Sequence, residues 1–435
     1  MAGNNKKYVE LLWHQKYDKL ELGEKMPVER HNLPFQIVET VNKPRIKGGE
    51  QQFLYPEDAW PRDYPKDWKN LLIWGDNKLV MSSLIKQGWA GKINLIYIDP
   101  PFFTGADFTV RTKVGDEEIE KEPSIIEERA YKDTWSGGIA SYLKYMYERL
   151  VLMRDLLAEN GSIYVHLDWH VGHYVKVMMD EIFGYENFRN EIVWKRADAH
   201  NDPDRYGNIH DLILFYTKTS QSWTWNIEEE YQELPQSTVQ SWYTNKEIAE
   251  KDIINRLGIL IKKGTIRYFN KADITGAGAN PNDKPFKGIM PPAGRHWAYK
   301  PEVMEKLDKE GRIYFSKSGK PYEKRYLDES KGIPPQSIWT DISLLRGMAK
   351  SQEGAEWLDF DTQKPEKLLK RIINISSSPG GIVADFFCGS GTTLAVAEKL
   401  GRRWVGCDLS KFAIQVTRKR LLDIHNSKDL MGEEK

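Results

Sequence analysis

A buried strand that ends in an acid, two prolines and an aromatic ring offers the clearest chemistry in this chain. Residues 95–98 are Leu, Ile, Tyr and Ile, an apolar run typical of a strand buried on both faces of a parallel sheet. The tetrapeptide that follows consists of Asp99, Pro100, Pro101 and Phe102. Because proline cannot donate to a ladder and keeps the preceding residue extended, the strand must end here. Ligands of open α/β sheets bind beyond the carboxyl ends of strands, so we expect chemistry at this tetrapeptide.

The tetrapeptide combines two hydrogen-bond acceptors with a flat apolar face. The Asp99 carboxylate and the Pro100 carbonyl can accept the two N–H bonds of an exocyclic amino group on a base. Phe102 provides a face on which a planar ring can stack. Gripping an aryl amine in this way favours a pyramidal nitrogen whose lone pair points outward. The alternative is a proline-rich turn without chemistry, and a second motif makes that alternative weaker.

The second motif is a glycine turn near the end of the chain. A predicted strand at 382–385 ends at Asp385, and Gly389 and Gly391 precede a helix that runs to about residue 400. Glycine lets the backbone approach a ligand closely, and a helix N-terminus attracts a carboxylate. The next predicted strand, 403–408, ends at Asp408, and an acid there can bind both hydroxyls of a ribose. This half of the chain is therefore predicted to bind an adenosine-bearing cofactor.

The chemistry of the glycine turn favours S-adenosyl-L-methionine. The lysine of a phosphate-binding P-loop is missing, and so is the third glycine of a dinucleotide fingerprint. Asp385 suits a cationic amino group, and the methionine end of S-adenosyl-L-methionine carries both an amine and a carboxylate. A dinucleotide-dependent oxidoreductase is the weaker alternative.

Alternating strands and helices must position these two motifs. A strand at 70–74 leads through the turn Gly75-Asp76-Asn77 into a helix that ends near residue 87. Asp76 therefore also lies at the end of a strand, although it could simply cap that helix. The other elements predicted between the motifs are a helix at 138–158, a strand at 162–167, a helix at 171–183 and an antiparallel pair at 191–194 and 211–216.

Composition excludes several classes of protein. The chain has 435 residues, a net charge of +0, 40% hydrophobic residues and two cysteines, Cys388 and Cys407, which fits a globular protein of two or three domains without a disulfide framework or zinc site. Four residues suggest a metal site, but their spacing favours structural or helix-cap roles: His166, Asp168, His170 and His173. We expect no metal. No membrane helix or signal region is visible, which predicts a cytoplasmic protein without membrane association.

Five segments are predicted along the chain. An N-terminal arm covers residues 1–67 and begins with an amphipathic helix candidate at 8–20. The half that contains the acid-proline tetrapeptide covers 68–219, and a separate region follows at 220–355. The half that contains the glycine turn covers 356–425, and a polar tail covers 426–435. The polar loop at 104–137 is expected to order on substrate. Between 220 and 355 basic residues alternate with aromatic ones, a pattern that fits contact with phosphates and bases. The residues predicted to contact DNA are Arg295, Trp297, Lys324 and Arg325.

At these motifs the chain resembles the amino-group DNA methyltransferases. Residues 99–102 match the catalytic motif of that family and 385–392 its cofactor motif. The order of catalytic motif, variable region and cofactor motif resembles the beta group, which includes the modification subunits of type III restriction systems. One departure is Phe386, where the family usually has proline.

The resemblance implies a fold and a set of roles. The fold would be the α/β class I S-adenosylmethionine-dependent methyltransferase fold, a mostly parallel, circularly permuted seven-stranded sheet with an inserted α+β target recognition domain at 220–355. Asp99 and Pro100 would hold the target amine and Phe102 would stack on a flipped base. The residues lining the cofactor would be Asp76, Lys364, Pro365, Asp385, Phe387, Cys388, Gly389, Gly391, Thr392 and Asp408.

The resemblance also implies a reaction. The acid-first tetrapeptide is similar to that of members that methylate adenine N6 in double-stranded DNA by base flipping and in-line transfer, whereas cytosine N4 enzymes more often carry serine first. Methylation of cytosine C5 is disfavoured because neither cysteine follows a proline. Methylation of RNA or of a protein amide, and a non-catalytic DNA-binding subunit, are the remaining alternatives. Further partners to consider are a restriction endonuclease subunit and a second copy of the chain in a homodimer.

Overall fold

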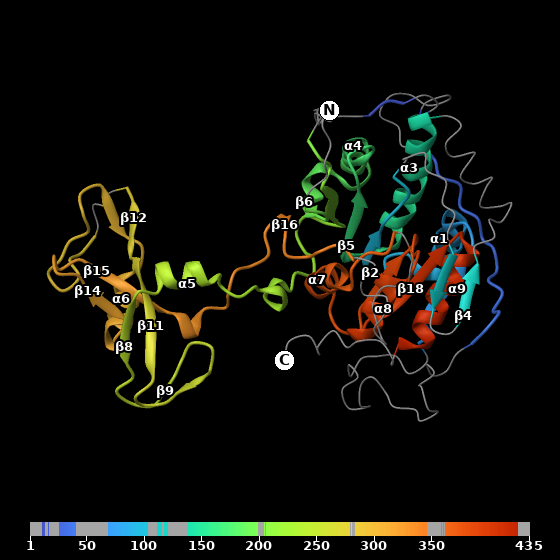
Figure 1. Cartoon of the computed structure of the whole chain (residues 1–435). Coiled ribbons are helices and arrows are strands. Elements are labelled where there is room, and N and C mark those ends of the chain that lie inside the picture. Colours follow the sequence, from blue (N-terminus) through green and yellow to red (C-terminus); the bar gives the residue numbers. More distant parts are fainter. Residues whose placement is uncertain are drawn as a thin grey trace, which may run out of the picture. The chain divides into compact units, whose positions relative to one another are not determined.

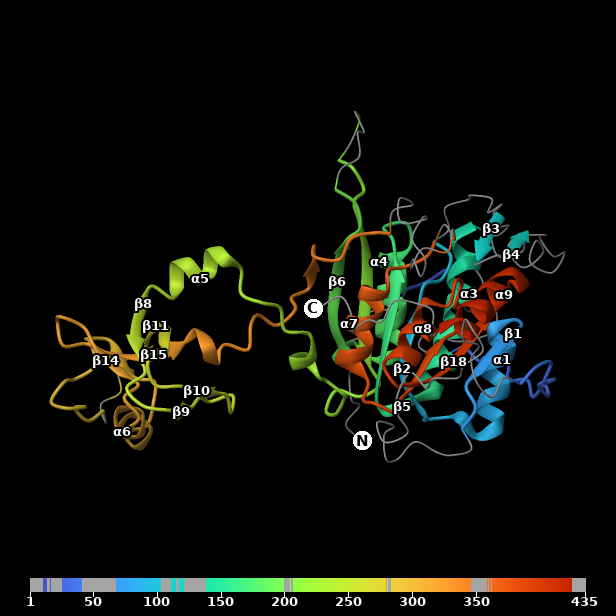
Figure 2. The same ribbon diagram turned by 60° about the horizontal axis from the view of Figure 1, so that its bottom comes forward.

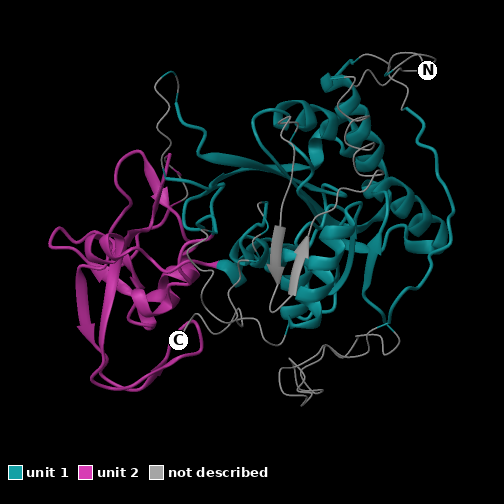
Figure 3. Cartoon of the chain, turned by 45° about the vertical axis from the view of Figure 1, so that its right-hand side comes forward, with its two compact units in different colours: residues 1–230, 335–435 teal, residues 231–334 magenta. Residues whose placement is uncertain are grey.

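The structure is a computed structural model, and it divides the chain into two compact units (Figure 3). Unit 1 comprises Met1–Glu230 and Pro335–Lys435, and unit 2 comprises Tyr231–Pro334. Unit 2 lies within the predicted region 220–355, whose role in target recognition stays a prediction. The described residues are 11–13, 16, 26–40, 68–102, 111–114, 117–120, 138–198, 204, 206–278, 280, 283–345, 358, 360 and 362–424.

Unit 1 is built on an eight-stranded sheet in which seven strands are mutually parallel and β7 is antiparallel to its neighbours (Figure 1). In spatial order the strands are β1 (Leu71–Trp74), β18 (Arg403–Asp408), β17 (Ile382–Asp385), β2 (Ile93–Ile98), β5 (Leu157–Leu167), β7 (His210–Thr217), β6 (Phe188–Lys195) and β16 (Ile338–Trp339). The mostly parallel α/β sheet is confirmed, but the strand number differs from seven. The eighth strand, β16, pairs with β6 through only two residues, too few to show a periodic pattern.

Helices cover both faces of this sheet (Figures 1 and 2). One core cluster joins the sheet to α1 (Asn77–Leu84), α3 (Gly138–Leu156) and α4 (Gly172–Phe183). The other joins it to α7 (Glu366–Ser376) and α8 (Thr392–Lys399). Strand β2 contributes to both clusters, with Ile96 and Ile98 in the first and Leu95 and Tyr97 in the second. This confirms the prediction that the apolar run before Asp99 is buried on both faces.

Unit 2 contains a four-stranded antiparallel sheet in the order β14-β15-β11-β8. Its elements are α5 (Gln236–Trp242), β8 (Asn245–Ile248), β9 (Ile253–Ile254), β10 (Leu260–Ile261), β11 (Ile266–Asp273), β12 (Thr275–Ala277), β13 (Arg295–Trp297), α6 (Pro301–Lys309), β14 (Ile313–Phe315) and β15 (Pro321–Tyr326). A small core that includes Trp297, Met304 and Ile313 packs α6 against this sheet. Unit 2 is thus an α+β unit with a core of its own.

Several predicted segments fall largely on residues that the structure does not describe. The amphipathic helix at 8–20, most of the arm and the tail at 426–435 lie outside the described residues. In the predicted loop 104–137 the described part forms an antiparallel pair, β3 (Arg111–Val114) and β4 (Glu117–Glu120). The last helix is α9 (Lys411–Leu422). Within the described ranges, every helix is too short or too polar to span a membrane.

Candidate active site

The acid-proline tetrapeptide and the glycine turn lie at the same edge of the sheet. Strands β17 and β2 are parallel neighbours, with Val383 opposite Leu95 and Ala384 opposite Ile96. Asp385 therefore ends its strand beside the segment that leads to Asp99, because the carboxyl ends of parallel strands meet at one edge. The two motifs are far apart in the sequence, but they lie together at this edge of the sheet.

Asp99 has one oxygen in an ion pair and the other without a partner among the described residues. Its Oδ2 accepts a hydrogen bond from Lys364 Nζ. Its Oδ1 is buried and accepts no hydrogen bond from any residue in the described part of the chain. The Lys364 ammonium also lies 5.6 Å from the centroid of the Phe102 ring. Since a buried acceptor without a donor is costly, Oδ1 is suited to accept an N–H from a ligand.

The glycine turn is held in a backbone conformation that glycine favours. Gly389 and Gly391 have φ angles of 50° and 74°. A Cβ atom on Gly391 would lie 2.6 Å from Thr417 Cγ2, so no other residue fits there without displacement. Thr417 Oγ1 donates to Gly389 O at 2.9 Å, and Gly389 N donates to Asp408 Oδ2 at 2.9 Å. These contacts fix the turn between β17 and α8.

Asp385 is a buried acid whose charge is disfavoured. Its carboxylate accepts hydrogen bonds from Phe387 N at 3.0 Å and Thr393 Oγ1 at 2.5 Å. Burial raises the pKa of Asp385 to about 7, against the effect of these two hydrogen bonds and with a further contribution from the charge of Asp99. A cation placed beside Asp385 would favour its ionised form. The donor set therefore fits the predicted cofactor: an acid for an amine, a turn of backbone amides for a carboxylate, and Asp408 for a ribose.

The acids at the ends of β18 and β1 are both used within the protein. Asp408 accepts from Ser410 N at 2.8 Å as well as from Gly389 N. Asp76 caps α1 by accepting from Lys78 N and Leu79 N, and its Oδ2 accepts from Arg149 Nη2 at 2.8 Å. The helix-cap hypothesis for Asp76 is thus the one the structure shows, and contact of Asp76 with the adenine of a cofactor stays a prediction.

The other predicted cofactor residues lie in the glycine turn, at the start of α8 and at the start of α7. Pro365 is the N-cap of α7, directly after Lys364. Phe387 is half-buried, with its ring centroid 6.4 Å from that of Tyr145. Cys388 is buried and its backbone N–H donates to Cys407 O at 3.1 Å. Thr392 Oγ1 accepts from Arg420 Nη1 at 2.9 Å.

Sequence analysis missed the residues that support the turn from other elements. Asn77 Nδ2 donates to Phe386 O at 2.9 Å, and Arg149 Nε donates to Asn77 Oδ1 at 2.5 Å. Asn77 stood in a turn that sequence analysis singled out, so its short polar side chain was a usable signal. Arg149 sits on the core-facing side of α3 and is 4% exposed, and a charged residue at a core position was the only available sign.

The four predicted DNA contacts all have partners inside unit 2. Arg295 donates to Thr275 Oγ1 at 2.6 Å, and Trp297 is buried with its Nε1 donating to Lys284 O at 3.0 Å. Two further pairs involve acids on the same sheet: Lys324 with Glu247 at 2.5 Å and Arg325 with Glu323 at 3.1 Å. The contact of these four residues with DNA stays a prediction.

In the histidine-rich segment after β5, Asp168 and His170 form a turn that leads into α4. Asp168 accepts from the backbone N–H of His170 at 2.9 Å and contacts the His170 ring at 2.5 Å, which shapes the turn into α4. Among the described residues no group of three or more acidic, histidine or cysteine side chains could hold a metal ion.

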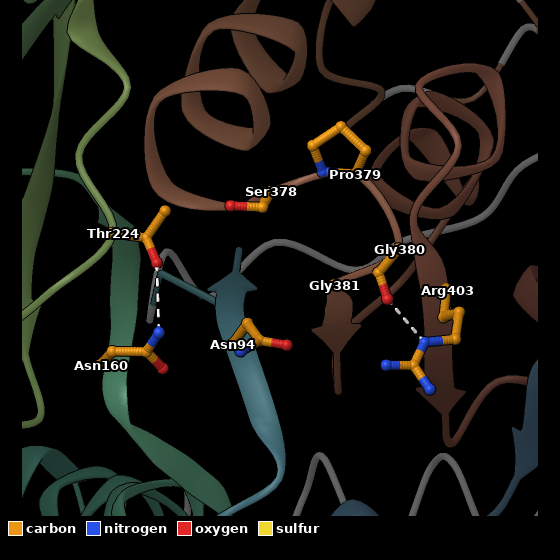
Figure 4. A pocket seen from close by; sticks show the side chains of 8 residues that line it. All are labelled: Asn94, Asn160, Thr224, Ser378, Pro379, Gly380, Gly381 and Arg403. Atoms are coloured by element: carbon orange, nitrogen blue, oxygen red, sulfur yellow. Dashed lines mark hydrogen bonds between the residues drawn. The ribbon is translucent and has the colours of Figure 1, made fainter. Parts of the chain in front are cut away.

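A cavity of about 260 Å³ lies at the opposite edge of the sheet (Figure 4). It is lined by residues at the amino ends of the strands and the loops before them, where Arg403 Nε donates to Gly380 O at 2.6 Å. Its lining residues are Asn94, Asn160, Thr224, Ser378, Pro379, Gly380, Gly381 and Arg403. Because it contains no residue of either motif, it has no part in the candidate active site.

Comparisons with known proteins show what the chain is similar to. A family model described as DNA methylase (N6_N4_Mtase) matches residues 93–419. Type II methyltransferase M.EcaI of Enterobacter cloacae is 33% identical over 353 residues, which cover 81% of this chain and 69% of that protein. The StyLTI Mod subunit of a type III restriction-modification enzyme from Salmonella typhimurium is 31% identical over 80% of this chain, which spans only 53% of that subunit. The crystal structure of the M1.HpyAVI-SAM complex covers 81% of this chain and 99% of its own at 14% identity and a TM-score of 0.38.

Proposed function

The chain belongs to the N6/N4 DNA methylase family, and from this we propose that it methylates N6 of adenine in double-stranded DNA with S-adenosyl-L-methionine as methyl donor. The observation that carries the proposal is the pairing of β2 with β17, which brings the acid-proline tetrapeptide beside the glycine turn. When bound, the cofactor supplies a methyl group on a positively charged sulfur. Asp385, Asp408 and the turn glycines would hold it.

Asp99 would orient the target nitrogen and stabilise the charge that arrives on it. Its Oδ1, which has no partner among the described residues, would accept one N–H of the adenine amine, and Pro100 O the other. When the methyl group passes to that nitrogen and S-adenosylhomocysteine leaves, positive charge would move from sulfur to nitrogen, so the attraction of Asp99 for the nitrogen would grow towards the transition state. A full charge pair at about 4 Å is worth roughly 4 kcal/mol at an effective dielectric near 20, and the developing fraction about half of that.

Phe102 would compensate for part of the cost of removing the base from the duplex. Unstacking and unpairing one base costs a few kcal/mol. Stacking of a base on an aromatic side chain returns about 1–3 kcal/mol. Phe102 is half-buried at the same edge as Asp99, which supports this role.

Two narrower proposals rest on the relatives. The compact unit Tyr231–Pro334 would recognise the target sequence. The StyLTI relative is a subunit of a restriction-modification enzyme, so a separate restriction endonuclease subunit is a candidate partner of this chain.

The test is methyl transfer to unmethylated plasmid DNA. The purified protein is incubated with plasmid and isotopically labelled S-adenosyl-L-methionine, and the DNA is hydrolysed to nucleosides for mass analysis. We expect labelled N6-methyladenine in the wild type and none in Asp99→Ala. Labelled N4-methylcytosine would overturn the adenine assignment, and label in RNA or protein but not in DNA would overturn the substrate class.

A further inference from the structure

Beneath the acid-proline tetrapeptide lies a buried chain of polar side chains from three adjacent strands. Tyr97 on β2 contacts His166 on β5 through its hydroxyl and Nδ1 at 2.8 Å. His166 Nε2 contacts Asp211 Oδ2 on β7 at 3.1 Å, and Arg196 Nε lies 2.9 Å from Asp211 Oδ1. His166 is completely buried and Tyr97 is 2% exposed. Within the described part of the chain, these contacts involve neither the glycine turn nor Oδ1 of Asp99.

The two polar contacts hold the His166 ring in one orientation. Burial raises the pKa of the Tyr97 hydroxyl well above its usual range, with smaller contributions from three nearby acids, so the hydroxyl stays protonated and can donate. Nδ1 of His166 faces this hydroxyl and Nε2 faces the Asp211 carboxylate, so each ring nitrogen has one polar partner. Burial alone would raise the pKa of Asp211, but the hydrogen bond with His166 and the nearby charges of Arg196 and Lys364 hold it below its ordinary value, so Asp211 remains an acceptor.

The His166 ring is in turn packed against Phe102. The two ring centroids are 6.0 Å apart with the planes inclined by 33°. Trp194 also packs on His166 edge-on, with its centroid 5.5 Å from that of the imidazole. The imidazole therefore lies in contact with both rings, and its orientation bears on that of the half-buried Phe102.

A purely structural role would not require this arrangement. The site is enclosed by aromatic rings, and an apolar side chain of similar volume would fill it without burying polar groups. Hydrogen-bonded polar groups in a core, such as Tyr97, His166 and Asp211, specify one arrangement of their side chains rather than adding much stability. The arrangement specified here ends at the aromatic face proposed to receive the target base.

We propose that His166 is a positioning residue for methyl transfer: its hydrogen bonds with Tyr97 and Asp211 set the plane against which Phe102 packs when it stacks on the target base. This inference rests on the proposed function. By this inference Tyr97, which stands two residues before Asp99, helps to orient the base through His166 and is more than a core residue.

The neighbouring strand offers a matched control. Tyr164 on β5 is the register partner of Tyr97, is equally buried at 2% exposure, and has its hydroxyl 2.7 Å from Ser376 Oγ. Its ring stacks on Phe215, with the centroids 4.4 Å apart. Tyr97→Phe and Tyr164→Phe each delete one buried hydroxyl with one hydrogen bond, so their effects on thermal stability should be similar.

The experiment compares single-turnover methyl transfer by the wild type and the two variants on saturating plasmid DNA, together with thermal unfolding and the Kd of S-adenosylhomocysteine. We expect Tyr97→Phe to lower the transfer rate about three- to tenfold, as expected for one lost hydrogen bond. Tyr164→Phe should keep the wild-type rate, and both variants should keep the wild-type Kd.

Equal rates in Tyr97→Phe and Tyr164→Phe, whether reduced or not, would overturn the positioning role. The same holds if Tyr97→Phe acts through a weaker Kd for S-adenosylhomocysteine, because His166 would then serve the cofactor. A wild type that transfers no methyl group to DNA is a distinct result: the proposed function fails, and this inference fails with it.

Discussion

Replacement of Asp385 by asparagine should separate the stability of the protein from its capacity to bind the cofactor. The folded protein raises the pKa of this buried acid from its ordinary value of 3.8 to about 7. A raised carboxyl pKa means that the folded state binds the proton more tightly than the unfolded state. Stability is therefore lost as the pH rises from about 4 to about 7, and the loss is complete above that range.

The size of this loss follows from the two pKa values. Moving the pKa from 3.8 to about 7 corresponds to about 4 kcal/mol when Asp385 is ionised in the folded protein. The asparagine side chain carries no charge at any of these pH values. Asp385→Asn should therefore be more stable than the wild type by up to about 4 kcal/mol at pH 8, and its advantage should shrink towards pH 4.

Cofactor binding should respond in the opposite direction. With a pKa of about 7, Asp385 is ionised in about 1% of molecules at pH 5 and about half at pH 7. The affinity of the wild type for a cationic amine should therefore rise about 50-fold over this interval, which lies below the titration of an ordinary α-amino group near 7.7–8.0. Asp385→Asn should bind weakly at both pH values.

Urea unfolding at pH 5 and pH 8 measures the difference in stability between the wild type and Asp385→Asn. Calorimetric titration at pH 5 and pH 7 with S-adenosylhomocysteine, which keeps the amine, measures the change in affinity. Thr393→Val, which removes one hydrogen bond to Asp385 but not its charge, is the control for local packing. The reasoning is refuted if Asp385→Asn is no more stable than the wild type at pH 8, or if the wild-type affinity is the same at pH 5 and pH 7.

Three other substitutions test the rest of the site. Asp99→Asn should lower single-turnover methyl transfer by about 100-fold or more, as for loss of a preorganised electrostatic group, while calorimetry finds cofactor affinity unchanged; a near-normal rate would contradict the role of Asp99. Gly391→Ala should lower the free energy of unfolding in urea by about 1–3 kcal/mol or more, because its φ is 74° and the new Cβ would lie 2.6 Å from Thr417. Gly401→Ala is the control for backbone strain alone, because Gly401 has a φ of 67° and no neighbour within 4 Å of the added Cβ. Lys364→Met should reduce the transfer rate at constant cofactor Kd if the lysine serves Asp99. Lys367→Met is the control, because in the described part of the chain Lys367 donates to Asp341 O and to no residue of the tetrapeptide. A weaker cofactor Kd in Lys364→Met would instead support the predicted place of Lys364 in the cofactor pocket.

The main chemistry was predictable because it depends on local patterns. An apolar run that stops at Asp99 must be a buried strand with an acid at its carboxyl end, and the glycines after Asp385 demand a turn. The strand-helix alternation then places both at one edge of a parallel sheet. The pairing of β2 with β17 confirms the common edge.

The partners of the site residues were not predictable because they come from distant segments. Nothing near Asp99 in the sequence points to Lys364, and nothing near Tyr97 points to His166 or Asp211. The basic residues of unit 2 illustrate the same limit. Alternation of Lys and Arg with aromatic residues suggested a surface for phosphates, but Glu247 and Glu323 on the same sheet pair with Lys324 and Arg325. Glu323 stands two residues before Arg325 on β15 and was visible in the sequence, whereas Glu247 lies on β8, and spacing along β15 does not reveal it.

The two acids of the site differ in where their counter-charge comes from, and this difference assigns their roles. Asp99 receives a cation from the protein itself, since Lys364 occupies one of its oxygens and leaves the other buried and, among the described residues, available. Asp385 accepts from neutral donors, Phe387 N and Thr393 Oγ1, and its pKa is about 7. An acid that already has a counter-ion can hold a neutral amine and meet charge that develops later. An acid held by neutral donors gains most from a ligand that arrives with a positive charge, so we expect the cationic end of the cofactor at the glycine turn and the target amine at the prolines.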